Sequence, residues 1–167
     1  MALNSYATPE GLEIGRAQAV QAEAAGVPCH TDMNPLLLKP SSDHTSQVVL
    51  NGRPIGNRNA FEYFRKEGRE ELRQEVNAAF DRLAARYNPI VMEGAGSISE
   101  INLRDTDLVN MPMACYADAD VILVADIDRG GVFASVYGSV MLQTPEDKKR
   151  IKAVSYTHLT LPTKLEV

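Results

Sequence analysis

The chain has 167 residues, 44% of them hydrophobic and 23% charged, and its 22 acidic and 17 basic residues give a net charge of −5. This composition is typical of a globular protein, and an acidic balance without a Lys/Arg cluster argues against nucleic acid as the main partner. No apolar run reaches the roughly 18 residues of a membrane span, and no signal peptide is apparent. Cys29 and Cys115 lack metal-ligand spacing and indicate reduced thiols. We therefore expect a cytoplasmic protein with neither a membrane nor a nucleic-acid partner.

The N-terminal part of the chain is predicted to begin with a loop and a helix. Residues 11–26 are rich in alanine and end in a glycine that suits a helix C-cap. On that helix Glu13 and Arg16 are one turn apart, which favours a surface ion pair. The proline-rich residues 28–40 then predict a short extended segment that brings Lys39 into a loop.

A short strand and a long helix are predicted next. Residues 47–50 read as a strand, and the following Asn51-Gly52 is a strong hairpin-turn signal. Between about residues 59 and 87, apolar side chains recur at mainly three-, four- and eight-residue steps, which is the pattern of a helix. Gly68 is a candidate break in this helix, and Asn88-Pro89 is expected to end it.

Two later apolar runs predict buried strands of a parallel sheet, and both lead into carboxylates and glycines. Residues 90–92 precede Glu93-Gly94-Ala95-Gly96-Ser97, and residues 119–125 precede Asp126-Ile127-Asp128-Arg129-Gly130-Gly131. Open α/β sheets bind ligands at the carboxyl ends of their strands, and glycines let a phosphate approach the backbone. The second glycine pair also precedes a predicted helix over residues 133–142, whose start would favour an anion.

The chemistry of these strand ends suits magnesium and a nucleotide. Mg²⁺ takes one or two carboxylates plus phosphate oxygens, whereas zinc would require His or Cys. No Gly-x-Ser-x-Gly elbow or Cys–His pairing indicates a covalent nucleophile, and no Gly-x-x-x-x-Gly-Lys-Ser/Thr loop occurs. Simpler interpretations stay open: Glu93-Gly94 as an ordinary turn, Asp126 or Asp128 as a helix N-cap, and Asp128–Arg129 as a structural ion pair.

The C-terminal residues divide into a strand and an unusual end. Residues 151–154 read as the start of another strand. From Ser155 the sequence resembles the translation of a sequencing adapter, so we interpret residues 155–167 as a non-native tail.

Six motifs in this order resemble those of cobyric acid synthases. They occupy residues 1–5, 13–18, 33–40, 93–97, 100–103 and 125–131. The resemblance covers about residues 1–154. It implies an α/β fold with an incomplete P-loop-NTPase-like (dethiobiotin-synthetase-like) parallel sheet flanked by helices. Residues 1–154 would form part of an ATP-dependent synthetase domain, without the P-loop strand expected upstream and the glutamine amidotransferase domain expected downstream.

The resemblance also implies an activity. Cobyric acid synthases carry out ATP- and glutamine-dependent amidation of four peripheral carboxylates of adenosylcobyrinic acid a,c-diamide, giving adenosylcobyric acid in cobalamin biosynthesis. ATP with Mg²⁺ would activate a carboxylate of the corrinoid as an acyl phosphate, and ammonia from glutamine would displace the phosphate. We expect this chain alone to be inactive, and poorly soluble or only partly ordered, because a missing central strand exposes apolar sheet edge.

The same resemblance assigns roles to individual residues. Glu93 is the best magnesium ligand, and Glu13 is a weaker second candidate for the metal or the substrate. The expected catalytic residues are Glu93, Asp126 and Asp128. Binding of nucleotide and substrate is assigned to Asn4, Glu13, Lys39, Gly94, Gly96, Asn102 and Arg129.

Two alternatives are weighed against this function. A cobyrinic acid a,c-diamide synthase-like enzyme shares the fold and reaction but amidates other carboxylates, and the motifs at residues 4–5 and 13–18 argue against it. A non-catalytic nucleotide-binding module of the ParA/MinD kind should keep a P-loop, and the loops at residues 100–103 and 126–131 argue against that module.

Overall fold

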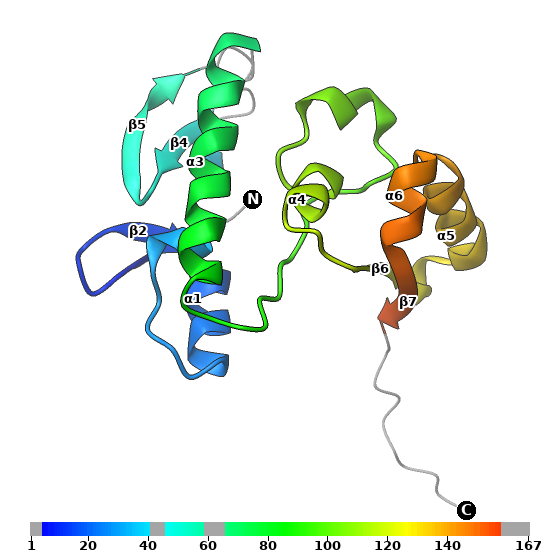
Figure 1. Ribbon diagram of the computed structural model, residues 1–167, viewed down its shortest axis with the longest axis horizontal. Helices are drawn as coiled ribbons and strands as arrows, with labels where there is room; N and C mark the ends of the chain where they lie inside the picture. The colour runs from blue at the N-terminus through cyan, green and yellow to red at the C-terminus, as the bar shows by residue number, and fades with distance from the viewer. Residues whose placement is uncertain (1–4, 41–45, 59–65, 158–167) are drawn as a thin grey trace, which may run out of the picture. The chain divides into compact units, whose positions relative to one another are not determined.

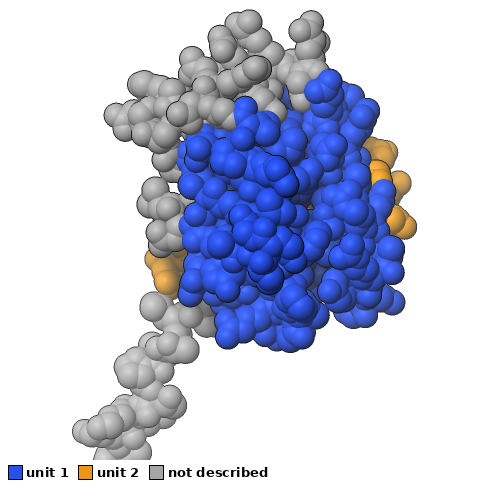
Figure 2. All heavy atoms as spheres, turned by 90° about the vertical axis from the view of Figure 1, so that its left-hand side faces the viewer, with its two compact units in different colours: residues 1–92 blue, residues 93–167 orange. Residues whose placement is uncertain are grey.

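The computed structural model describes residues 5–40, 46–58 and 66–157, drawn in colour in Figure 1. The chain divides into two compact units, unit 1 (residues 1–92) and unit 2 (residues 93–167), which Figure 2 distinguishes by colour. Both units combine helices with strands, so the predicted α/β class is confirmed. The described strands form two antiparallel sheets in unit 1 and one parallel pair in unit 2. The finer expectation of a P-loop-NTPase-like sheet stays a prediction.

Each unit contains both helices and strands, in the following order along the chain. Those of unit 1 are β1 (Ser5–Ala7), β2 (Glu13–Gly15), α1 (Arg16–Ala24), the 3-10 helix η1 (Thr31–Met33), β3 (Leu36–Pro40), β4 (Ser46–Leu50), β5 (Arg53–Arg58) and α3 (Lys66–Ala84). Those of unit 2 are η2 (Ile101–Thr106), α4 (Met111–Tyr116), β6 (Val121–Asp126), η3 (Ile127–Arg129), α5 (Val132–Met141), α6 (Pro145–Arg150) and β7 (Ile151–Thr157).

The predicted helix over residues 11–26 begins only at Arg16, because the residues before it form β2. This strand pairs antiparallel with β1, which lies in a stretch predicted to be a loop. Ile14 is fully buried, and the backbone N–H of Glu13 donates to the carbonyl oxygen of Gly52 at 3.0 Å. Residues 13–15 pair with Ala7, Tyr6 and Ser5 in an antiparallel ladder, which needs extended backbone. The predicted helical pair of Glu13 with Arg16 is therefore wrong.

The predicted hairpin turn at Asn51-Gly52 is confirmed. It joins β4 to β5 in the antiparallel sheet β3-β4-β5, and the two turn residues have φ of 48° and 78°. Positive φ at both positions is the type I′ geometry that matches the twist of hairpin strands. A register shift between Val48 and Val49 lets both of these neighbouring side chains be buried, where a regular strand would bury only one.

The long predicted helix is confirmed as α3, which runs unbroken through Gly68. The predicted start at residues 59–65 lies outside the described residues. Leu72 and Ala79 are its most buried side chains, at 2% and 0% exposed, and lie about two turns apart on one face. That face packs against the rest of unit 1, where η1 is its main contact.

Unit 2 contains a parallel pair of strands joined by a crossover connection, and both strands were predicted. β6 and β7 pair in parallel from Val121 opposite Ile151 to Asp126 opposite Thr157. The chain between them forms η3, α5 and α6, as parallel pairing requires a long connection. Both strands and the helix predicted over residues 133–142 are thus confirmed, the last as α5.

The predicted strand over residues 90–92 is wrong. These residues have no strand conformation, and the side chain of Val91 is 92% exposed. An apolar run becomes a strand only where another strand satisfies its backbone groups, and the structure gives this one no partner among the described residues. Glu93 therefore follows an extended connection and not the end of a strand.

β6 is a strand, but the prediction that it is buried is wrong. Ile122 and Val124 are 62% and 64% exposed on one of its faces. The expectation of poor solubility, which rests on an exposed apolar sheet edge, stays a prediction.

β7 extends beyond the predicted boundary of the native sequence. Ser155, Tyr156 and Thr157 continue its pairing with β6, and the Tyr156 ring lies edge-on to that of Phe133 at 6.3 Å between centroids. The interpretation of residues 155–167 as a non-native tail stays a prediction.

Within the described parts of the chain, no helix has both the length and the apolar character needed to cross a membrane.

Candidate functional site

The Glu93-Gly94-Ala95-Gly96-Ser97 loop of unit 2 is held by the side-chain amide of Asn110. Asn110 Oδ1 accepts the backbone N–H of Ala95 at 3.0 Å, and Asn110 Nδ2 donates to the carbonyl oxygen of Ala95 at 2.8 Å. We call this two-point contact the Asn110 clamp. It satisfies both polar groups of one loop residue, as a neighbouring strand would, and so gives the loop a defined path without a preceding strand.

The Asn110 clamp is itself oriented by an aspartate. Asp107 Oδ1 accepts the backbone N–H of Val109 at 2.8 Å and that of Asn110 at 3.1 Å, in an Asx turn that leads into α4. The clamp also explains Gly94, because a Cβ atom there would lie 2.4 Å from Asn110 Oδ1. Gly96 is required for a different reason, since its φ is 67°.

The chain after this loop is fixed by Gln143, whose side chain is buried. Gln143 Nε2 donates to the carbonyl oxygens of Ile98 at 2.8 Å and Ser139 at 2.9 Å, and Oε1 accepts from Arg104 Nη2 at 3.1 Å. Asn102 lies exposed in η2, next to this anchored segment. Sequence reasoning singled out neither Gln143 nor Asn110, because a single amide side chain has no diagnostic spacing.

The expected site at the end of β6 contains a helix cap. Asp126 Oδ1 accepts the backbone N–H of Asp128 at 3.0 Å and the Thr157 hydroxyl at 3.2 Å, so the N-cap interpretation of Asp126 is confirmed. Asp128 is exposed in η3. The backbone of Arg129 ends η3, and its side chain lies outside the described part of the structure.

Two expected binding residues of unit 1 form an ion pair. Lys39 Nζ lies 2.5 Å from Glu13 Oε1, joining β3 to β2, so Lys39 lies in a strand and not in the predicted loop. Both side chains are partly exposed, at 28% and 22%. Arg16, the partner predicted for Glu13, lies instead over the ring of Tyr6, 5.3 Å from its centroid. Asn4 lies outside the described residues.

Acid is expected to weaken unit 1 through Glu13. Hydrogen bonds from Lys39, and then from Ser5, lower the pKa of Glu13 below its ordinary value of 4.5. A lowered pKa contributes stability above the unfolded-state value, and that stability is lost as the pH falls through the folded-state value. The free energy of unfolding of the unmodified chain, measured by urea unfolding followed by circular dichroism, should therefore fall by up to about 1 kcal/mol more between neutral pH and about pH 3 than that of Glu13→Gln. Glu23→Gln, at an exposed position of α1, is the control and should lose as much as the unmodified chain. A loss in Glu13→Gln equal to that in Glu23→Gln would contradict the prediction.

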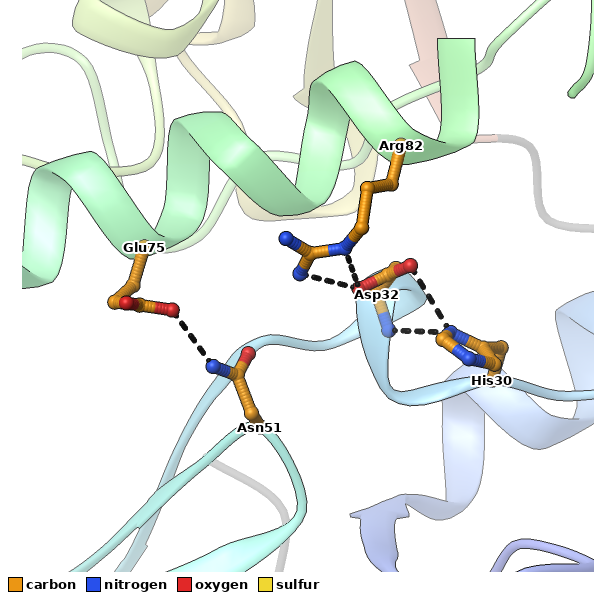
Figure 3. Close-up of polar contacts among 5 residues, drawn as sticks. All are labelled: His30, Asp32, Asn51, Glu75 and Arg82. Atoms are coloured by element: carbon orange, nitrogen blue, oxygen red, sulfur yellow. Dashed lines mark hydrogen bonds and ion pairs between the residues drawn. The ribbon is translucent and has the colours of Figure 1, made fainter. Parts of the chain in front are cut away.

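A buried carboxylate that sequence reasoning missed ties α3 to η1 (Figure 3). The Asp32 side chain is 2% exposed, and its Oδ1 accepts from Arg82 Nε at 3.0 Å and Nη2 at 2.6 Å. His30 Nδ1 accepts the backbone N–H of Asp32 at 3.1 Å. Beside this pair, Asn51 Nδ2 donates to Glu75 Oε2 at 2.8 Å, which fixes the hairpin turn to α3 (Figure 3). These contacts are architectural, and the pKa of Arg82 is raised by its bond to Asp32.

Unit 1 also has an open hollow of about 390 Å³ beside α1. Tyr6, Arg16, Val20, Glu23 and Cys29 are among its lining residues. The expected site residues that the structure describes lie elsewhere, so the hollow does not enter the site considered below.

The expected site residues fall into separate groups. Glu13 and Lys39 meet in unit 1, whereas the Asn110 clamp and the end of β6 belong to unit 2. In the described residues, no three His, Cys, Asp or Glu side chains gather as a metal site. Mg²⁺ held mainly by phosphate oxygens needs only one or two carboxylates, so the hard oxygen donor of Glu93 fits that ion.

Comparison with known proteins gives high identity to one family. The cobyric acid synthase of Phocaeicola vulgatus is 99% identical over 154 residues, which are 92% of this chain and 31% of that protein. That of Bacteroides fragilis is 89% identical over the same shares. The probable cobyric acid synthase of Methanothermobacter thermautotrophicus is 54% identical over 154 residues, 92% of this chain and 30% of that protein. The chain matches cobyric acid synthases over 92% of its length.

The resemblance seen in the six motifs is thereby confirmed as similarity to cobyric acid synthases. The chain spans about a third of the length of the curated relatives it matches. No protein-family model matches it, and no solved structure matches it.

Proposed function

We propose that this chain is part of an enzyme of cobalamin biosynthesis that amidates peripheral carboxylates of adenosylcobyrinic acid a,c-diamide, giving adenosylcobyric acid. The observation that carries the proposal is the 99% identity to the cobyric acid synthase of Phocaeicola vulgatus over 92% of the chain. Glutamine is the proposed source of ammonia, through an amidotransferase domain for which this chain offers no candidate residues. The reaction would take place in the cytoplasm.

The proposed cofactors are ATP and Mg²⁺, and Glu93 is the proposed metal ligand. When bound, they would supply the activation of the substrate carboxylate and the neutralisation of phosphoryl charge. The path of the Glu93 loop supports this role, because the Asn110 clamp fixes its backbone two residues after Glu93. At Gly94 the space that a side chain would fill holds Asn110 Oδ1, so the close approach of a phosphate is proposed at Gly96.

The remaining assignments concern charge at the corrinoid and at the nucleotide. We propose that Asp126, Asp128 and Arg129, with Asn102 and Asn4, contact the reacting carboxylate and phosphoryl groups. The two consecutive glycines before α5 support an anion there, because both have positive φ and the ten-residue helix that follows directs its first N–H groups toward that end.

Glu13 and Lys39 are proposed to act together. Their ion pair places a cation for phosphate and a second carboxylate for metal or substrate side by side. Both side chains keep part of their surface exposed, which leaves them accessible to a ligand.

The proposal is tested in the full-length relative from Phocaeicola vulgatus, with the substitution Glu93→Gln at the matching position. Amidation of adenosylcobyrinic acid a,c-diamide with ATP, Mg²⁺ and glutamine is expected to fall at least about a hundredfold in kcat, as when one preorganised electrostatic group is removed. Glu146→Gln, at an exposed position of α6, should leave the rate unchanged. A full-length relative that amidates no corrinoid carboxylate would refute the function, and an unchanged Glu93→Gln rate would refute the role of Glu93.

A further inference from the structure

The Asn110 clamp on the Glu93 loop has no role in the proposed chemistry so far. Its two hydrogen bonds pair the acceptor and the donor of the Asn110 side-chain amide with the backbone N–H and carbonyl of one residue, Ala95. Because these two groups belong to the peptides on either side of the Ala95 Cα atom, the pairing restrains the position and the orientation of both peptide planes. Ala95 is two residues after Glu93, so few backbone torsions separate the fixed peptide from the carboxylate.

The surroundings of the clamp keep it in one arrangement. The Asx turn of Asp107 fixes the backbone from which the Asn110 side chain projects, and α4 begins directly after it. Gly94 has no side chain where Asn110 Oδ1 lies, and a Cβ atom at this position would come within 2.4 Å of it. Gly94 and Asn110 therefore form one steric and hydrogen-bonding unit.

We infer that Asn110 is a positioning residue for Glu93, whose clamp on Ala95 holds the Glu93 carboxylate at the place where Mg²⁺ and the nucleotide phosphates bind. The inference rests on the proposed function, since it gives Glu93 the role of metal ligand. Asn110 itself does not contact the metal. Its removal should loosen the loop and weaken metal-dependent nucleotide binding without removing a ligand.

The structural half of the inference is tested on the 167-residue chain by hydrogen exchange. Asn110→Ala is expected to raise the exchange rate of the Ala95 amide at least about tenfold, because its acceptor is lost. Asn110→Asp keeps an acceptor for Ala95 N–H but loses the donor to its carbonyl, so it should give an intermediate rate. Thr144→Ala removes the N-cap of α6, a loss of similar size away from the loop, and should leave the Ala95 rate unchanged.

A double-mutant cycle separates the clamp from general destabilisation. Gly94→Ala alone should raise the Ala95 exchange rate as Asn110→Ala does, because the new Cβ displaces the Asn110 side chain. In the Asn110→Ala background, Gly94→Ala should add less than about twofold, since the displaced group is already absent. Full additivity of the two effects, or an Ala95 rate unaffected by Asn110→Ala and Asn110→Asp, would overturn the clamp.

The functional half is tested in the full-length relative from Phocaeicola vulgatus by calorimetric binding of a non-hydrolysable ATP analogue at increasing Mg²⁺. Asn110→Ala should raise the Mg²⁺ concentration for half-maximal nucleotide binding about tenfold, Asn110→Asp less, and Thr144→Ala not at all. If the unmodified relative shows no Mg²⁺-dependent nucleotide binding, the proposed function and this inference both fall. If it binds nucleotide and both Asn110 variants leave the Mg²⁺ dependence unchanged, only the positioning role of Asn110 is overturned.

Discussion

Replacing Arg82 by methionine is expected to lower the free energy of unfolding of the chain by about 3 kcal/mol. Arg82 supplies both hydrogen bonds to Asp32 Oδ1, and the Asp32 side chain is only 2% exposed. Oδ2 is buried and lies 3.1 Å from His30 Nδ1, which cannot donate to it while it accepts the Asp32 N–H. Without Arg82 the buried carboxylate would lose its main hydrogen-bond donors. Leaving a buried charge without donors costs far more free energy than breaking an ion pair at the surface.

Urea unfolding followed by the helical circular dichroism signal measures this loss. Arg86→Met removes an exposed arginine just beyond α3 and should change the unfolding free energy by less than about 0.5 kcal/mol. Asp32→Asn in the Arg82→Met background should recover part of the loss, because the uncompensated charge is gone. A loss below about 1 kcal/mol for Arg82→Met would mean that solvent or His30 already compensates Asp32.

Replacing Gly52 by alanine is expected to destabilise the chain by about 3 kcal/mol through two separate effects. Its φ of 78° is unfavourable for a residue with a side chain. A Cβ atom would also lie 2.7 Å from Leu12 Cβ and 2.7 Å from Thr31 Cγ2. The hairpin turn would have to move away from β2 and η1, which would break the hydrogen bond from Glu13 N–H to the Gly52 carbonyl.

Gly26 offers a matched control for the backbone effect. Its φ is 69°, and a Cβ atom there would meet nothing within 4 Å. Gly26→Ala should therefore lose only the backbone part, about 1 kcal/mol, and the difference between the two variants measures the close packing around Gly52. Equal losses in urea unfolding would show that the turn has room to relax and that the packing argument is wrong.

Local patterns predicted those elements whose formation depends on neighbouring residues. The spacing of apolar residues indicated α3, the apolar runs indicated β6 and β7, and Asn51-Gly52 indicated the turn between β4 and β5. In each case helix periodicity, strand composition or turn chemistry acts within a few positions, and the final fold agrees with it.

The wrong predictions share a dependence on distant partners. Residues 13–15 have helix-favouring neighbours, yet they form β2 because they pair with β1 and because the Gly52 carbonyl accepts the backbone N–H of Glu13. Residues 90–92 have the composition of a strand, yet they remain irregular because no described strand pairs with them. Whether such a segment forms a strand depends on pairing partners elsewhere in the chain, and local composition carries no information about those partners.

The candidate site divides in the same way between sequence and structure. The similarity to cobyric acid synthases and the residue types of the expected site follow from the order of the motifs alone, because motifs are compared without coordinates. The pairing of Glu13 with Lys39 and the contact of Asn110 with the Glu93 loop follow only from the folded chain. These contacts join residues 26 and 15 positions apart, and a hydrogen bond between such residues exists only after the chain has folded them together.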